Sequence, residues 1–135
     1  MKKLQEIQKA EGKTSGEIVV SIREKYDKDF ADHKPEVRIH EQASYEFERL
    51  GVYRTREKNG VLILLMLKNR EFKILGDKGI YEKIPAGQWD IWAKELSKNF
   101  RQGKFEGGLC ALINFIGIKL AEAFPRAKDD KNELS

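Results

Sequence analysis

Apolar residues recur along the chain with helical spacing in four segments, which predicts four amphipathic helices. Pro35 suits the first turn of the second helix, and Pro125 ends the last. Gly12 and Gly51 each end a helix. The four apolar stripes are Leu4, Ile7 and Ala10; Ile39, Ala43, Phe47 and Leu50; Trp89, Trp92, Ala93, Leu96 and Phe100; and Leu109, Leu112, Ile113, Ile116 and Leu120.

Three shorter segments predict strands. The runs "EIVVSI" (17–22) and "GVLILLML" (60–67) are continuously apolar or β-branched, as in strands buried on both faces. The segment "REFKILG" (70–76) follows the second run after the turn "KNR", so we expect an antiparallel hairpin. Its inward residues are expected to be Phe72, Ile74 and Leu75, with Lys73 outward.

The order of elements is helix, strand, helix, strand, strand, helix, helix. The first two strands are joined through a helix, so we expect them to run parallel with a right-handed crossover. Four helices on a small mixed sheet predict a three-layer α/β/α sandwich. We expect one domain over residues 1–125 and a polar, disordered tail over residues 126–135.

The charge pattern argues against nucleic acid as a partner. The 26 basic and 22 acidic side chains are interspersed and leave a net charge of only +4, whereas phosphate binding needs clustered basic charge. The N-terminus is charged and lacks the apolar region of a signal peptide, and the longest apolar run, 107–118, is too short to cross a bilayer. We therefore expect a cytoplasmic monomer without a membrane span, in which Cys110 is a buried small hydrophobe.

Known binding motifs match this chain only in part. "GKT" (12–14) lacks the preceding glycine of a P-loop and comes before a strand instead of after one. Asp27, Asp29 and Asp32 resemble the start of an EF-hand loop, but an aspartate stands where that loop needs its turn glycine. A solvated loop is the favoured interpretation of these acids. They do, however, follow the carboxyl end of a parallel strand, where open α/β sheets often bind ligands.

Catalytic motifs give no candidate residue. His33 and His40 lack the further ligands of a zinc site and are expected to be surface histidines. No serine lies in a G-x-S-x-G elbow. The strand motif of RNA-binding domains is missing, although "REFKILG" carries basic and aromatic residues on a predicted strand.

Three segments follow one another in a distinctive order and spacing: "AEGKTSGEIVVSI", "KNGVLILLMLKNREFKILGDKGI" and "GGLCALINFIGIKLAEAFP". Together they resemble the TPM domain family, and the resemblance extends over residues 4–125. That family includes thylakoid-lumen proteins linked to photosystem II repair, for which acid phosphatase activity has been proposed. The resemblance is closest to soluble bacterial members. It implies an α/β/α sandwich and, as in some members, binding of calcium through acidic side chains.

The resemblance gives the stretch "LGDKGI" (75–80) a candidate function. If the third strand runs antiparallel to the second, Asp77 returns beside Asn59 and the start of the first strand at Glu17. Two carboxylates and an amide would supply the hard oxygen ligands that suit calcium or magnesium. The competing interpretation makes Asp77 a turn residue between two glycines.

The chain also departs from extracytoplasmic relatives. "PAG" (85–87) stands where many of them carry an aspartate, and metal-assisted hydrolysis needs an activated water or a nucleophile. We therefore predict a TPM-type binding or assembly-assisting module for an unidentified protein partner, with a weak calcium or magnesium site and no catalytic residues. The alternatives are a low-activity metal-dependent acid phosphatase and, third, an RNA-binding domain.

Overall fold

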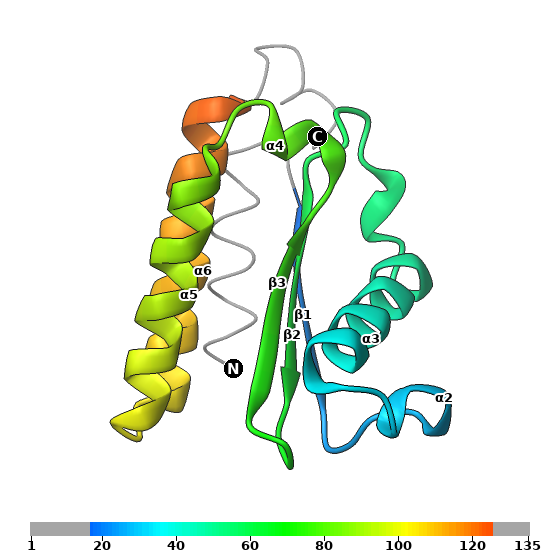
Figure 1. Cartoon of the computed structure of the whole chain (residues 1–135). Coiled ribbons are helices and arrows are strands. Elements are labelled where there is room, and N and C mark those ends of the chain that lie inside the picture. Colours follow the sequence, from blue (N-terminus) through cyan, green and yellow to red (C-terminus); the bar gives the residue numbers. More distant parts are fainter. Residues whose placement is uncertain (1–16, 126–135) are drawn as a thin grey trace, which may run out of the picture.

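A three-stranded mixed sheet forms the centre of the computed structural model, which describes residues 17–125. The strands β1 (Glu17–Arg23), β2 (Gly60–Met66) and β3 (Glu71–Gly76) lie in the order β1-β2-β3. β1 runs parallel to β2, and β3 pairs antiparallel with β2. The predicted mixed sheet, with the most apolar strand in its centre, is confirmed (Figure 1).

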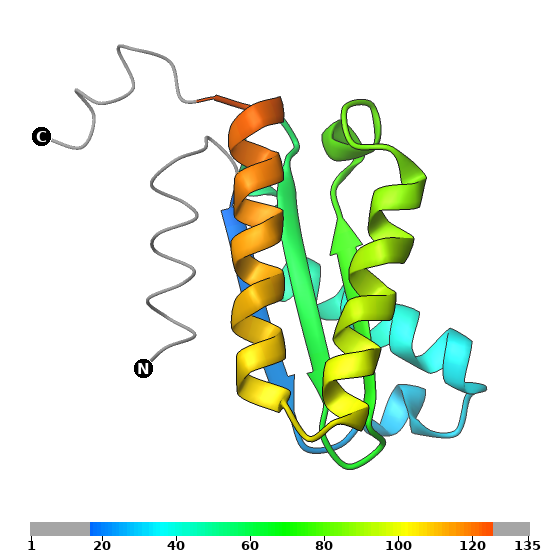
Figure 2. The ribbon, with the colours of Figure 1, turned by 90° about the vertical axis from the view of Figure 1, so that its left-hand side faces the viewer.

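Helices cover both faces of this sheet. α3 lies on one face, and α5 and α6 lie side by side on the other (Figures 1 and 2). The layers are therefore helix, sheet and helix, as predicted. The bounds are α2 (Lys28–Ala31), α3 (Pro35–Arg49), the 3-10 helix η1 (Val52–Arg54), α4 (Lys78–Tyr81), α5 (Ala86–Arg101) and α6 (Phe105–Ala123). The sequence did not predict α2, η1 and α4, because one helical turn is too short to show a periodic pattern. The helix expected at Leu4–Ala10 and the tail 126–135 lie outside the described residues.

β2 is buried along its whole length and separates two apolar cores. Alternate side chains of a strand point to opposite faces. One set packs with α5 and α6, and the other packs with α3 and η1. The first set is Val61, Ile63 and Leu65, and the second is Leu62, Leu64 and Met66.

The core beneath α5 and α6 follows the predicted stripes. All five apolar residues predicted for α6 are buried, as are Trp92 and Leu96 of α5. Phe72 and Ile74 of β3 also pack against this core, while Leu75 packs on the α3 side. The expectation that Cys110 is buried is wrong. It is only partly buried, because its position on α6 lies beside the apolar stripe and not on it.

The contact between α3 and the sheet is more polar than the apolar stripe predicted. Ala43 is fully buried, but so are Gln42 and Glu46, whereas Leu50 at the end of the stripe is 37% exposed. The carboxylate of Glu46 accepts hydrogen bonds from the Ser21 hydroxyl at 2.9 Å and from the Arg49 guanidinium at 2.6 Å. These contacts join α3 directly to β1.

Arg23 and Asp27 extend this polar cluster along the carboxyl end of β1. Arg23 donates to Glu46 at 3.2 Å and to Asp27 at 2.5 Å. The amide of Gln42 donates to the Asp27 carboxylate and accepts from the Asp27 backbone N–H, both at 3.0 Å. A buried carboxylate is tolerated when its oxygens are paired in this way. Asp27, one of the acids expected in a solvated loop, is therefore a structural residue.

The charge of Glu46 is maintained by its partners. Burial by itself raises the pKa of Glu46, but hydrogen bonds from Arg49 and Ser21 and the charges of Arg49 and Arg23 outweigh that effect. The pKa of Glu46 therefore lies below its ordinary value. Its ionised form stabilises the folded chain.

The packing of Trp92 gives a first stability prediction. Trp92 is 3% exposed and makes an edge-to-face contact with Trp89 at 5.2 Å between ring centroids. We expect Trp92→Ala to cost about 3–5 kcal/mol in urea denaturation, the usual loss for a buried large aromatic. Ile91→Ala, at a neighbouring position that is 56% exposed, is the control and should cost little. Equal losses in the two variants would contradict the placement of α5.

A second prediction concerns Glu46 and pH. We expect Glu46→Gln to cost about 2 kcal/mol near neutral pH, because it weakens hydrogen bonds to charged groups. The folded pKa of Glu46 is lowered, so its contribution is complete above the unfolded value of about 4.3 and is lost as the pH falls through the folded pKa. Denaturation of both proteins at several pH values should therefore show their stabilities converging in acid.

Glu48→Gln is the matched control, because Glu48 lies two residues away on the same helix and is exposed. This variant should retain the stability of the unmodified chain at every pH. A Glu46→Gln penalty that is independent of pH would show that the carboxylate charge is not what joins α3 to β1.

Candidate functional site

Glu17, Asn59 and Asp77 come together at one end of the sheet. In the parallel register Glu17 lies opposite Gly60, the residue that follows Asn59. The backbone N–H of Asp77 donates to the Gly60 carbonyl at 2.9 Å. The antiparallel course of β3 thus returns Asp77 to the start of β2, which is the backbone arrangement that the sequence predicted. The role of these residues as metal ligands remains a prediction.

Asp77 has a structural role at this position. It is the N-cap residue of α4, and its Oδ1 accepts a hydrogen bond from the backbone N–H of Lys78 at 2.7 Å. The second carboxylate oxygen, Oδ2, is buried and has no hydrogen-bond partner within residues 17–125. Burial of a carboxylate oxygen is costly unless a donor or a cation lies against it. Capping of α4 therefore uses only one of the two carboxylate oxygens of Asp77.

The glycines on either side of Asp77 are required by close packing. A Cβ on Gly76 would lie 2.9 Å from the Trp89 ring, and a Cβ on Gly79 would lie 2.1 Å from the Glu57 carbonyl oxygen. The Gly79 N–H also donates to the Lys58 carbonyl at 2.8 Å. These contacts hold the stretch 75–80 against both α5 and the loop before β2. The position of Asp77 is thus determined by its neighbours.

Glu17 and Asn59 differ in burial. Glu17 is partly buried, and this burial raises the pKa of its carboxyl group. The side chain of Asn59 is fully buried, and its backbone N–H donates to the Thr55 hydroxyl at 2.9 Å. A cation near Glu17 would favour its ionised form.

The donor set at this end of the sheet consists of two carboxylates and an amide, which are ligands for a hard cation such as calcium or magnesium. No group of three or more His, Cys, Asp or Glu side chains arranged for a metal occurs in the described part of the chain. A calcium ion takes six to eight oxygen ligands. Backbone carbonyls and water would therefore have to complete its shell, which corresponds to low affinity.

The other acids and histidines considered from the sequence do not form a site with these residues. Asp29 and Asp32 are exposed, as is His40. His33 contacts the carboxylate of Glu41 at the surface. Between residues 17 and 125 these side chains form no group that could hold a metal ion. The exposed positions of Asp29 and Asp32 agree with the interpretation that they belong to a solvated loop.

Sequence reasoning missed a second polar cluster, on the α3 side of β3. Glu71 accepts two hydrogen bonds from the Arg38 guanidinium, at 3.1 and 2.8 Å, and one from the Tyr26 hydroxyl at 2.6 Å. Burial and the neighbouring Glu71 raise the pKa of Tyr26. The three residues are distant in the sequence, so no local pattern predicts their contact. They join the loop after β1 and α3 to the edge strand.

Comparison with known proteins agrees with this architecture. The NMR structure of the BA42 protein from the psychrophilic bacterium Bizionia argentinensis is similar, with a TM-score of 0.80 and 34% sequence identity. The similarity covers 95% of this chain and 82% of that one. A search of curated proteins found no match. None of the helices within residues 17–125 is both long and apolar enough to cross a membrane. A profile of the TPM domain matches residues 2–117, and the chain therefore belongs to the TPM domain family.

Proposed function

We propose that this TPM domain is a binding or assembly-assisting module for a protein partner and that it takes up a divalent cation, calcium first, with low affinity. The cation would be held by Asp77 and Glu17, with Asn59 as an amide ligand. When bound, it would neutralise two carboxylates at the end of the sheet. This would connect the starts of β1 and β2 with the end of β3.

The observation that supports this proposal is the buried Oδ2 of Asp77, which has no hydrogen-bond partner among the described residues. The backbone N–H of Asp77 is hydrogen-bonded to the Gly60 carbonyl. Because this holds the backbone in place, the Oδ2 oxygen is preorganised instead of free to turn towards water. Glu17 lies level with Gly60 on the adjacent strand, and burial disfavours its ionised form. A cation between the two carboxylates would offset both costs.

Asp77→Asn tests the cation site directly. Asn is also a good N-cap residue, so the fold should be retained. We expect calcium binding to weaken by one to two orders of magnitude, or roughly 1.4–2.8 kcal/mol, because one ligand charge is lost. Calorimetry measures the affinity, and amide shifts on titration of the unmodified chain should be largest near Glu17, Asn59 and Asp77.

Asp90→Asn is the matched control, because it removes the same charge from an exposed position on α5. It should bind calcium as the unmodified chain does. Calcium affinity that is unchanged in Asp77→Asn would remove Asp77 from the site. If the unmodified chain does not bind calcium at all, the proposed site is wrong and helix capping is the whole role of Asp77.

Activity assays on the unmodified chain and on Asp77→Asn distinguish a binding module from a phosphatase. A metal-dependent phosphatase needs a bound water or a side chain activated for attack on phosphorus. We expect no calcium-dependent hydrolysis of p-nitrophenyl phosphate at acidic or neutral pH by the unmodified chain. Turnover that depends on calcium and falls in Asp77→Asn would instead establish the enzymatic alternative.

A further inference from the structure

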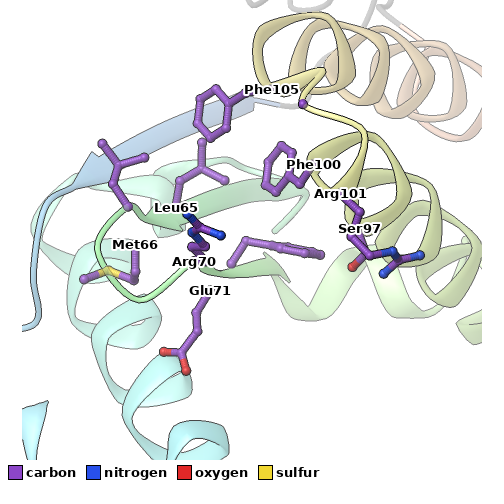
Figure 3. A pocket seen from close by; sticks show the side chains of 11 residues that line it. Leu65, Met66, Arg70, Glu71, Ser97, Phe100, Arg101 and Phe105 are labelled. Atoms are coloured by element: carbon purple, nitrogen blue, oxygen red, sulfur yellow. The ribbon is translucent and has the colours of Figure 1, made fainter.

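A cavity of about 560 Å³ lies at the other end of the sheet. It is bounded by the β2–β3 hairpin turn, the start of β3, the C-terminal part of α5 and the start of α6 (Figure 3). Cavities that hold small ligands commonly have volumes of this size. The six residues of β3 separate it from Asp77 by about 20 Å, so the two sites are distinct.

One wall of the cavity is aromatic. The rings of Phe100 and Phe105 stack at 4.8 Å with an interplanar angle of 18°, and Phe72 meets Phe100 edge-to-face at 5.8 Å. Phe105, the first residue of α6, is 36% exposed. A partly exposed cluster of three rings provides an apolar surface for a ligand to cover.

Two positively charged side chains line the cavity. Arg70 extends from the hairpin turn, while Arg101 and Ser97 come from α5 on the facing side (Figure 3). Neither arginine side chain makes an ion pair or hydrogen bond to any residue between 17 and 125. Glu71 is the one acid in the lining, and its carboxylate turns away towards α3, where Arg38 and Tyr26 bind it (Figure 3). The cavity therefore has two guanidinium groups without a counter-ion from the described chain.

The backbone of Arg70 is unusual. Its φ of 53° lies in the left-handed region, and in the described part of the chain only Lys58 (φ 54°) shares this feature among non-glycine residues. Glycine adopts this conformation without steric cost, whereas an arginine does so at a disadvantage. Strained residues of this kind cluster at binding sites. The turn thus carries an arginine at a position that a glycine would occupy at lower steric cost.

We infer that this cavity binds a small organic carboxylate with a flat apolar body of one or two rings. The Arg70 guanidinium matches a carboxylate in charge and in hydrogen-bond geometry. The exposed Arg101 side chain, which points away from Arg70 in Figure 3, would turn towards the bound carboxylate, and the Ser97 hydroxyl adds a donor. The apolar body packs on Phe72, Phe100 and Phe105. A neutral ligand would lack the ion pair with the arginines, and a small anion such as acetate would leave the aromatic wall uncovered, so both should bind more weakly.

The test is an NMR titration of the full chain with 2-naphthoate as the probe. Two control compounds each keep one feature of 2-naphthoate. 2-Naphthalenemethanol has the rings without the charge, and acetate has the charge without the rings. We expect 2-naphthoate to bind at least tenfold more tightly than either, with the largest amide shifts in residues 67–72 and 100–105. Equal affinity for the alcohol, or absence of 2-naphthoate binding, would overturn the inference.

Arg70→Gly separates binding from stability. Because glycine suits the positive φ, the thermal midpoint should stay the same or rise, while 2-naphthoate affinity should fall at least tenfold. Lys58→Gly is the matched control: it removes a cation from the same backbone conformation at the other end of the sheet, and binding should not change.

Arg101→Gln provides a second, independent variant on a helix, where no backbone effect is expected. It should also weaken 2-naphthoate at least tenfold while leaving calcium titrations at Asp77 unaffected. Full affinity in both arginine variants, or an equal loss in Lys58→Gly, would show that the cavity does not recognise the carboxylate.

Discussion

The strand β2 has no exposed residue from Gly60 to Met66, so both of its faces must be covered and both of its edges must be paired. Seven consecutive buried residues of this kind can be accommodated only between two helical layers. α3 supplies one layer, and α5 with α6 supplies the other. The parallel pairing with β1 and the antiparallel pairing with β3 then determine which loops meet at each end. Both the acidic end and the hairpin end of the molecule depend on this one strand.

The two helical layers are held to the sheet by different forces. α5 and α6 pack through a large apolar core that includes Trp92 and Leu96, and the stability of this layer follows from the area it buries. α3 buries Glu46 and Gln42 and joins β1 through hydrogen bonds and ion pairs. Such contacts contribute little net free energy but are costly to leave incomplete, so they favour one position of the helix over others. The position of α3 is therefore more narrowly defined than that of α5 and α6, and the contact of α3 with the sheet is more sensitive to pH.

The two ends of the sheet differ in charge. At one end the acidic residues Glu17 and Asp77 lie beside Gly60 at the ends of the neighbouring strands, and one carboxylate oxygen of Asp77 is buried without a hydrogen-bond partner in the described chain. At the other end Arg70 and Arg101 line a cavity together with aromatic rings. The length of β3 keeps these groups about 20 Å apart, because each residue of a strand advances the chain by about 3.3 Å. A cation and an organic anion would thus have separate sites on the same small scaffold.

The hydrophobic pattern was enough to predict the layers, the strand order and most of the apolar core. These features follow from residue spacing, and the burial of β2 and of the stripe on α6 leaves few alternatives. The sequence also indicated that Asp77 returns to the start of β2, because that follows from a hairpin of known length. The roles of individual polar residues, in contrast, became clear only from the packing of the elements. Glu46 and Gln42 lie beside an apolar stripe, and Arg38 meets Glu71 from a distant segment. Whether such residues are buried and paired depends on which element covers them, and local periodicity carries no information about that contact.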